Sequence, residues 1–200
     1  RIIAKDFQRM NDKQQEAIFT TEGPLLLLAG AGSGKTTVLV NRIANLIKYG
    51  QAYNSSLSEF EPTYEDVELM KAYLLDDSVD LFDVFDLLSV KPAKPWEILA
   101  ITFTNKAANE LKERLARMLG DSAIDIWAST FHSTCAKILR RFGESIGYSN
   151  HFTIYDTDDS KRVIKDAVKA LNLDSDAYKP NMVLGKISSA KSEFISCEEY

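Results

Sequence analysis

Cysteine is scarce in this sequence, which has only two, Cys135 and Cys197, without the spacing of a metal site. A secreted domain held together by disulfides would be richer in cysteine, so a reducing cytoplasm is the expected compartment. Apolar runs are also short: none approaches the roughly 18 residues of a membrane span, and no signal peptide opens the chain. The first residue is Arg1 rather than Met, so we expect a trimmed piece of a longer protein. These absences argue against a disulfide scaffold and against a membrane protein.

The net charge is −5 over 200 residues, which at first argues against nucleic acid as a partner. The charge is unevenly distributed, because residues 51–95 hold ten acidic and three basic side chains, whereas the rest holds 19 acidic and 21 basic ones. Phosphate contacts depend on local rather than total charge, so DNA is not excluded. The length suits one medium domain, or one domain and part of another, and a hydrophobic content of 45% supplies a sizeable core.

A glycine-rich octapeptide, Ala-Gly-Ala-Gly-Ser-Gly-Lys-Thr, occupies residues 29–36 between two regular patterns. The apolar run before it predicts a buried strand at 25–29, and residues 38–47 predict a helix. The predicted buried face of that helix consists of Leu39, Ile43, Leu46 and Ile47. Strand, glycine-rich loop and helix are the context of a phosphate-binding loop, in which backbone N–H groups and the helix N-terminus surround phosphate oxygens.

This loop predicts a site for a nucleoside triphosphate. Lys35 would reach the β- and γ-phosphates, and the Thr36 hydroxyl would bind Mg²⁺. The loop residues expected to hold the phosphates are Ala31, Gly32, Ser33, Gly34, Lys35 and Thr36.

Two further apolar runs, 98–103 and 124–129, predict strands, and a helical pattern follows each of them. The periodic residues are Ala108, Leu111, Leu115, Met118 and Leu119 after the first run, and Ala136, Leu139 and Phe142 after the second. Gly120 is a typical stop for the first of these helices. Strands that alternate with helices predict an α/β fold with a parallel sheet and right-handed crossovers.

The acidic segment 51–95 interrupts this alternation. Its apolar residues predict two short helices, one carrying Val67, Met70 and Leu74, the other Leu81, Phe82, Phe85 and Leu88. Either the segment is a surface insertion that packs its own apolar faces, or it docks another domain or a partner.

A different character begins at Ser149, where the sequence becomes polar and helical. One helix is predicted to begin near Asp158 and a second at Pro180. The predicted apolar face of the first consists of Val163, Ile164, Ala167 and Leu171. These residues are expected to open a separate helical region.

The ends of the second and third predicted strands carry similar residues. They are Thr102-Phe103-Thr104-Asn105-Lys106 and Ser129-Thr130-Phe131-His132-Ser133. Ligands bind beyond the carboxyl ends of the strands of an open parallel sheet, and hydroxyls, helix N-termini and aromatic rings suit single-stranded nucleic acid. Taken singly, Phe103 and Phe131 are more often core residues, but their recurrence at the edge predicted for the nucleotide favours DNA binding.

Two other motif interpretations fail. Asn105-Lys106 resembles the start of the guanine-reading motif of GTPases, but Ala108 stands where that motif needs a carboxylate. Asp76 and Asp77 follow two leucines, as in an acidic Mg²⁺ element, but they lie at helical spacing inside the acidic segment. No other apolar run ends in paired acids, so we expect the acid that positions the attacking water to be absent from this chain.

Several single residues carry weaker expectations. Trp96 and Trp127 flank strands and are expected in the core, and Cys135 is expected to be packed rather than reactive. Arg140-Arg141 could contact phosphates or form a solvated helix face.

Four motifs in this order resemble the N-terminal motifs of UvrD/Rep/PcrA-type superfamily 1 DNA helicases. They are Met10-Asn11-Asp12-Lys13-Gln14, the glycine-rich loop, residues 100–108 and Ser129-Thr130-Phe131-His132-Ser133. The resemblance covers nearly the whole chain except the acidic segment. It implies a RecA-like ATP-binding domain that begins over residues 1–133, with an acidic helical insertion at 51–95, and the start of an inserted all-helical domain over 134–200.

The resemblance also implies residue roles. Gln14 would read adenine through its amide, and Lys35 and Thr36 would hold the phosphates and Mg²⁺. Thr37, also beside the nucleotide, stands where many members carry Arg. The single-strand track would consist of Thr102, Phe103, Thr104, Asn105, Lys106, Thr130, Phe131, His132 and Ser133.

By resemblance, the parent protein would use ATP to move 3′ to 5′ on single-stranded DNA and to unwind duplex from single-strand junctions, in repair or replication. The second RecA-like domain and its arginines would lie outside these 200 residues, so this piece alone is expected to be inactive. The alternatives are the helicase subunit of a helicase–nuclease complex, a nucleotide-gated DNA-binding protein without motor activity, and a small-molecule kinase. Binding of a protein partner to residues 51–95 is a further alternative.

Overall fold

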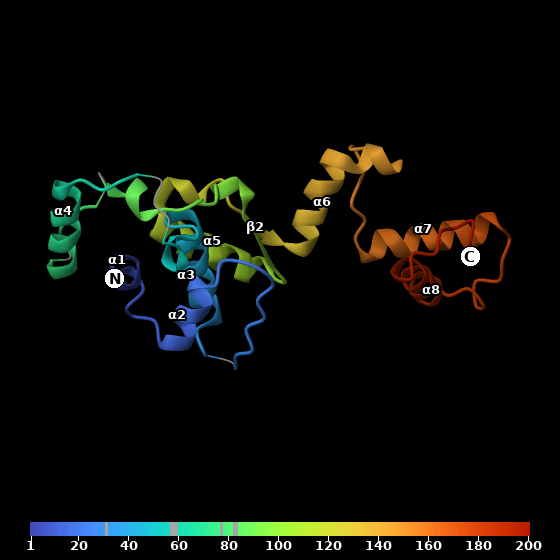
Figure 1. The fold of residues 1–200 in the computed structure, drawn as a ribbon. Coiled ribbons are helices and arrows are strands. Elements are labelled where there is room, and N and C mark those ends of the chain that lie inside the picture. Colours follow the sequence, from blue (N-terminus) through green and yellow to red (C-terminus); the bar gives the residue numbers. More distant parts are fainter. Residues whose placement is uncertain (31, 57–59, 77, 82–83) are drawn as a thin grey trace. The chain divides into compact units, whose positions relative to one another are not determined.

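The computed structural model describes residues 1–30, 32–56, 60–76, 78–81 and 84–200 (Figure 1). The chain divides into two compact units, Arg1–Ile138 and Leu139–Tyr200. The first unit contains α1 (Ile2–Asp6), α2 (Asp12–Phe19), α3 (Lys35–Lys48), α4 (Tyr64–Leu75), β1 (Leu99–Thr102), α5 (Asn105–Leu119) and β2 (Trp127–Thr130). Short 3₁₀ turns lie at Ala52–Asn54, Asp86–Leu88, Pro95–Glu97 and Gly120–Ala123. Helix α6 (Phe131–Phe142) crosses the boundary between the units.

The sheet of the first unit consists, over the described residues, of β1 and β2, which run parallel with Thr102 opposite Thr130. Helix α5 connects them, so the predicted α/β alternation with parallel pairing is confirmed for these strands. Strand β2 begins later than the predicted 124–129, because Gly120–Ala123 forms a 3₁₀ turn and the Ile124 side chain stays 79% exposed.

The strand predicted at 25–29 is wrong. These residues have no regular secondary structure, and Leu26 and Leu28 are 80% and 88% exposed. A parallel strand needs neighbours whose N–H and C=O groups pair with its own. No described strand lies beside 25–29 in this chain, so apolar composition alone does not produce a strand there.

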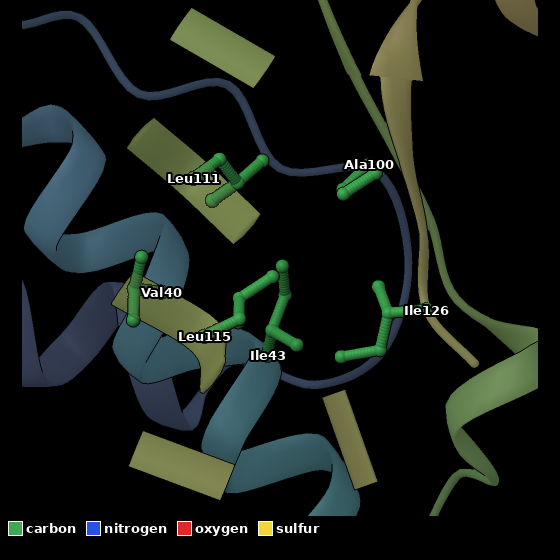
Figure 2. Close-up of a cluster of buried hydrophobic side chains, with 7 residues drawn as sticks. Val40, Ile43, Ala100, Leu111, Leu115 and Ile126 are labelled. Atoms are coloured by element: carbon green, nitrogen blue, oxygen red, sulfur yellow. The ribbon is translucent and has the colours of Figure 1, made fainter. Parts of the chain in front are cut away.

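The main core of the first unit lies between α3, α5 and the sheet (Figure 2). It consists of Val40, Ile43, Ala100, Leu111, Leu115, Ile126 and Ala128. The buried Leu111 and Leu115 confirm the periodicity predicted for α5. On α3, however, Leu39 is 38% exposed and Val40 is buried in its place. The prediction failed because α3 is buried on two sides, with Val38 facing a second cluster.

That second cluster joins α1 and α2 to α3. It consists of Phe7, Ala17, Ile18, Phe19, Val38 and Tyr49. Phe7 packs edge-on against Phe19 and Tyr49, at ring-centroid distances of 5.4 and 6.4 Å. From α3, Arg42 donates hydrogen bonds to the carbonyl groups of Ala17 and Thr20. The C-terminal end of α2 is therefore fixed against α3, and this holds α2 beside the glycine-rich loop.

The acidic segment leaves and rejoins the body at one place. Gly50 and Val90 form a parallel bridge, and the Gln51 N–H donates to the Val90 carbonyl at 2.8 Å. A Cβ atom at Gly50, where φ is +59°, would lie 2.2 Å from the Val90 oxygen, so only glycine fits there. Phe85 and Leu88 then pack against the second cluster. The segment thus packs on the body of the unit and not only on itself.

Of the two helices predicted in this segment, the first is α4, whose Val67, Met70 and Leu74 are half-buried as predicted. The second is not found as an α-helix over the described residues, where a 3₁₀ turn forms at Asp86–Leu88. Phe82 and Asp77 lie outside the described residues.

Tyr49 is 2% exposed, and its hydroxyl donates a hydrogen bond to Asp6 Oδ2 at 2.5 Å. Burial and the Asp6 carboxylate raise the pKa of the Tyr49 phenol far above its ordinary value near 10. Since the folded state favours the neutral phenol, this stabilisation is complete below pH ~10 and is lost as the pH rises further. We expect urea unfolding followed by circular dichroism to show a steeper loss of stability from pH 9 to 11 in wild type than in Tyr49→Phe. Parallel pH profiles would contradict this assignment.

The second unit contains α7 (Thr157–Ala170) and α8 (Pro180–Ser192), which pack against each other. Asp156 caps α7 by accepting the N–H groups of Asp158 and Asp159, so the predicted helix start is confirmed. The predicted face is wrong in part, because Val163, Ala167 and Leu171 are exposed whereas Val168 is buried. The spacing of apolar residues predicts which side of a helix is apolar. The position of the neighbouring helix determines which residues on that side are buried. No described helix is long and apolar enough to cross a membrane.

Candidate functional site

The glycine-rich loop ends directly at the start of α3. Gly32 and Gly34 adopt φ values of +76° and +83°, which side-chain-bearing residues rarely adopt. Gly34 is the N-cap of α3, so Lys35 and Thr36 lie in its first turn, where backbone N–H groups have no acceptor within the helix. Such free N–H groups, with the positive end of the helix dipole, suit phosphate oxygens. Ala31 lies outside the described residues.

Lys35 folds back across the loop. Its ammonium group donates hydrogen bonds to the carbonyl oxygens of Ala29 at 2.9 Å and Gly30 at 2.6 Å. The Ser33 hydroxyl donates to the same Gly30 oxygen at 2.8 Å. The ammonium group is therefore held at the loop by exposed contacts, and anionic oxygens are stronger acceptors for it than carbonyl groups.

Gln14 of α2 lies beside the loop. Its Oε1 accepts the Asn11 N–H at 3.1 Å in a capping box, and its Nε2 donates to the Ser33 carbonyl at 3.2 Å. Gln14, Ser33 and Lys35 line one cavity of about 520 Å³. The structure thus brings together three residues that the sequence assigned to one nucleotide, although they come from two separate helices and a loop.

Thr36 and Thr37 differ in their surroundings. Thr36 is exposed in the first turn of α3, whereas the half-buried Thr37 has its Oγ1 within 3.4 Å of Arg114 of α5, which also pairs with Glu110 at 2.6 Å. The sequence interpretation missed Arg114, because one arginine on a helix carries no distinguishing pattern. No group of three His, Cys, Asp or Glu side chains that could hold a metal occurs among the described residues. The Thr36 hydroxyl suits Mg²⁺ as a single oxygen ligand, with phosphate and water oxygens completing the shell.

The two strand ends form the second part of the site. Because β1 and β2 are parallel and in register, both carboxyl ends lie at the same edge of the sheet. The rings of Phe103 and Phe131 lie there with centroids 5.3 Å apart and planes tilted by 42°. Phe103 is 87% exposed and Phe131 46% exposed. The sequence favoured DNA binding over a core position for both rings, and the structure leaves both exposed at the surface.

Hydroxyl groups at these strand ends have structural partners. Thr104 caps α5 by accepting the Ala107 N–H at 3.2 Å. Thr130 is 7% exposed and accepts the Ser133 N–H at 3.3 Å, so its hydroxyl is occupied within the turn. Thr102, half-buried, donates to the Thr104 carbonyl at 3.2 Å. The side chains that the structure leaves exposed at this edge, besides the two rings, are Thr104, Asn105, Lys106, His132 and Ser133.

Three weaker expectations can be compared with the structure. Trp96 is 61% exposed, so its expected core position is wrong; it lies in the turn Pro95–Glu97, before the sheet begins. Trp127 is half-buried, with the Lys137 ammonium 5.9 Å from its ring centre. Cys135 is exposed, contrary to the expectation that it is packed, because Thr134 is the only described residue of α6 that is buried.

One family model matches most of this chain. The model of the UvrD/REP helicase N-terminal domain matches residues 10–58 and 82–200, which is most of the chain. The chain belongs to the UvrD/REP helicase family. The family match omits residues 59–81, which contain α4. The unmatched stretch is therefore shorter than the insertion predicted at 51–95.

Curated UvrD/REP-type relatives are similar over nearly all of this chain. Proteins named ATP-dependent DNA helicase PcrA are 45% identical over 184 residues in Staphylococcus aureus (strain Mu50 / ATCC 700699) and 44% identical over 192 residues in Leuconostoc citreum. These alignments cover 92% and 96% of this chain, and 20% of each relative. The chain therefore spans about a fifth of the length of the relatives that it matches.

Proposed function

We propose that this chain is the N-terminal ATP- and single-strand-binding part of an ATP-dependent DNA helicase that moves 3′ to 5′ on DNA. Residues 1–133 would begin a RecA-like domain, and residues 134–200 would begin a helical domain inserted in it. Membership of the UvrD/REP family and the PcrA helicases among its relatives support this proposal.

ATP would bind at the glycine-rich loop. The N–H groups at the start of α3 and the Lys35 ammonium group would bind the phosphates, and the Thr36 hydroxyl oxygen would coordinate Mg²⁺. The Gln14 amide offers one acceptor and one donor, which complement the N6 amino group and N7 of adenine. Both atoms of that amide are engaged by Asn11 and Ser33, so the base would share or replace these partners.

Single-stranded DNA would lie along the carboxyl edge of β1 and β2. The observation that carries this part of the proposal is the exposed pair of rings, Phe103 and Phe131, 5.3 Å apart on consecutive strand ends. Adjacent exposed apolar side chains are typical of binding surfaces, and unpaired bases stack on aromatic rings without regard to sequence. Lys106 and His132, both exposed at the same edge, could contact phosphates.

The test is ATP hydrolysis by the full-length protein with and without an unstructured oligothymidine. A helicase of this class should hydrolyse ATP faster when the oligonucleotide is present, and it should displace a strand from a substrate with a 3′ single-stranded tail. DNA affinity that depends on ATP without turnover would instead identify a nucleotide-gated DNA-binding protein. A rate of ATP hydrolysis that is the same with and without the oligonucleotide would support a small-molecule kinase.

These 200 residues by themselves are expected to show no DNA-stimulated hydrolysis. The described residues provide a phosphate-binding loop, but no strand that ends in acidic residues able to position the attacking water. The purified piece would be assayed for phosphate release at the same ATP and DNA concentrations as the full-length protein. Measurable DNA-stimulated turnover would contradict this expectation.

A further inference from the structure

Helix α4 belongs to the stretch, 59–81, that the family model does not match, yet it contacts α1 (Figure 1). The Tyr73 hydroxyl donates to Asp6 Oδ1, and the Lys5 ammonium group donates to the Tyr73 carbonyl and lies 4.4 Å from its ring centre. Asp6 also accepts the hydroxyl of the buried Tyr49. One carboxylate thus ties α4, α1 and α3 together, so α4 has a defined inner face.

The outer face of α4 is not the polar surface usual for a solvated helix. Tyr64 at its first turn is 78% exposed, and Leu75 at its last turn is 91% exposed. Glu65, Glu68, Lys71 and Ala72 lie exposed between them. Tyr64 and Leu75 are about 16 Å apart along the helix axis, given a rise of 1.5 Å per residue. The outer face therefore offers two apolar anchors separated by a polar stretch whose two carboxylates and one ammonium group leave a net negative charge.

Charge decides what can cover this face. Residues 60–76 contain five acidic side chains and one basic one, Lys71, which pairs with Glu68 at 2.7 Å. A nucleic acid would be repelled by such a surface, and a second copy of this chain, with a net charge of −5, is disfavoured as well. A protein segment with apolar residues at helical spacing and flanking Lys or Arg residues complements both the anchors and the carboxylates.

We propose that the outer face of α4 is a docking surface for a basic, amphipathic helical segment of another protein. Its apolar side chains pack on Tyr64 and Leu75, and its Lys or Arg side chains pair with Glu65 and share Glu68 with Lys71. Because the contacts of Tyr73 and Lys5 hold α4 on α1, the surface is formed before the partner arrives, which lowers the entropic cost of binding. This surface lies in residues that the family model does not match, and the docking proposal does not require the proposed DNA-binding residues.

The first test uses the full-length protein and a fluorescent 18-residue helical peptide with leucines on one face and lysines beside them. Fluorescence anisotropy should show salt-sensitive binding to wild type. Binding should weaken at least tenfold in the double variant Tyr64→Ala/Leu75→Ala, and similarly in Glu65→Lys/Glu68→Lys. A matched control, Tyr148→Ala/Leu171→Ala, removes two side chains that are 60% and 68% exposed elsewhere and should bind within twofold of wild type.

Three outcomes would overturn the proposal: equal binding to wild type and both α4 variants, no binding to wild type, or equal binding of a peptide with glutamate in place of lysine. Circular dichroism melting of each variant excludes unfolding as the cause of lost binding. Sedimentation of the full-length protein tests the remaining occupant, because concentration-dependent association lost in Tyr64→Ala/Leu75→Ala would mean that a second copy covers α4.

A second test identifies the partner in cells. A photo-crosslinking amino acid placed at position 75 of the full-length protein should form an adduct whose partner peptide, mapped by mass spectrometry, is basic and helical. The adduct should disappear in Glu65→Lys/Glu68→Lys and persist in the Tyr148→Ala/Leu171→Ala control. An adduct only within the protein's own chain would overturn the proposal.

Discussion

In the full-length protein, Lys35→Ala is expected to lower ATP turnover about 100-fold or more while leaving affinity for single-stranded DNA largely unchanged. Lys35 is the first residue of α3, and its ammonium group lies across the glycine-rich loop on the Ala29 and Gly30 carbonyls. A positive charge in that position stabilises the charge that develops on transferring phosphate oxygens, and removing one such group commonly costs about 10²–10³ in rate. Phosphate release at saturating DNA measures the effect.

The control for this variant is Lys48→Ala, which removes a lysine from the last turn of the same helix. Since Lys48 lies at the opposite end of α3 from the loop, its loss should leave turnover within about twofold. Unchanged turnover in Lys35→Ala would remove the phosphate-loop assignment. A similar loss in both variants would point to a general effect on α3 rather than to phosphate binding.

Phe103→Ala is expected to weaken binding of single-stranded DNA by about 1–3 kcal/mol, which is the usual contribution of a ring that stacks on a base. Because the Phe103 side chain is 87% exposed, little packing is lost and the melting temperature should change little. Phe131→Ala is expected to act in the same direction, but with some loss of stability, because this ring is only 46% exposed. Anisotropy of a labelled oligothymidine measures the affinity.

Trp96→Ala provides the matched control for the rings. Trp96 is also exposed, at 61%, but it precedes β1 and so lies at the opposite end of that strand from Phe103. Its replacement should leave DNA affinity within twofold. If Phe103→Ala melts earlier while the affinity of the folded protein is unchanged, the ring has a packing role and the DNA track must lie elsewhere.

Sequence patterns predicted those elements whose stability is mostly local. Helix α5 has the apolar face at Leu111 and Leu115 and the stop at Gly120 that the sequence predicted, and the Thr104 side chain caps its start. The two glycines at positive φ before Lys35 likewise follow from the motif, because few other residues adopt that backbone. The helices α7 and α8 begin at an Asp cap and at Pro180, both of which are recognisable in sequence.

Other features depended on contacts between distant residues. The run 25–29 has the composition of a buried strand, but it lacks a described pairing partner and remains without regular structure. Leu39 and Val40 are adjacent and similarly apolar, and only the positions of α5 and α2 around α3 decide which of them is buried. The same ambiguity made Trp96 and Cys135 look like core residues, since hydrophobicity does not report whether another element covers a side chain.

The sequence by itself determined the glycine-rich loop at the start of α3, the family and the parallel strand–helix alternation, because these depend on residue types at short, defined spacings. Only the tertiary structure brought Gln14 to the loop, put the rings of Phe103 and Phe131 side by side in solvent, and fixed α4 to α1 through Asp6. These arrangements join residues that are far apart along the chain or on different strands. Their distances follow from how the elements pack, and no local pattern in the sequence specifies that packing.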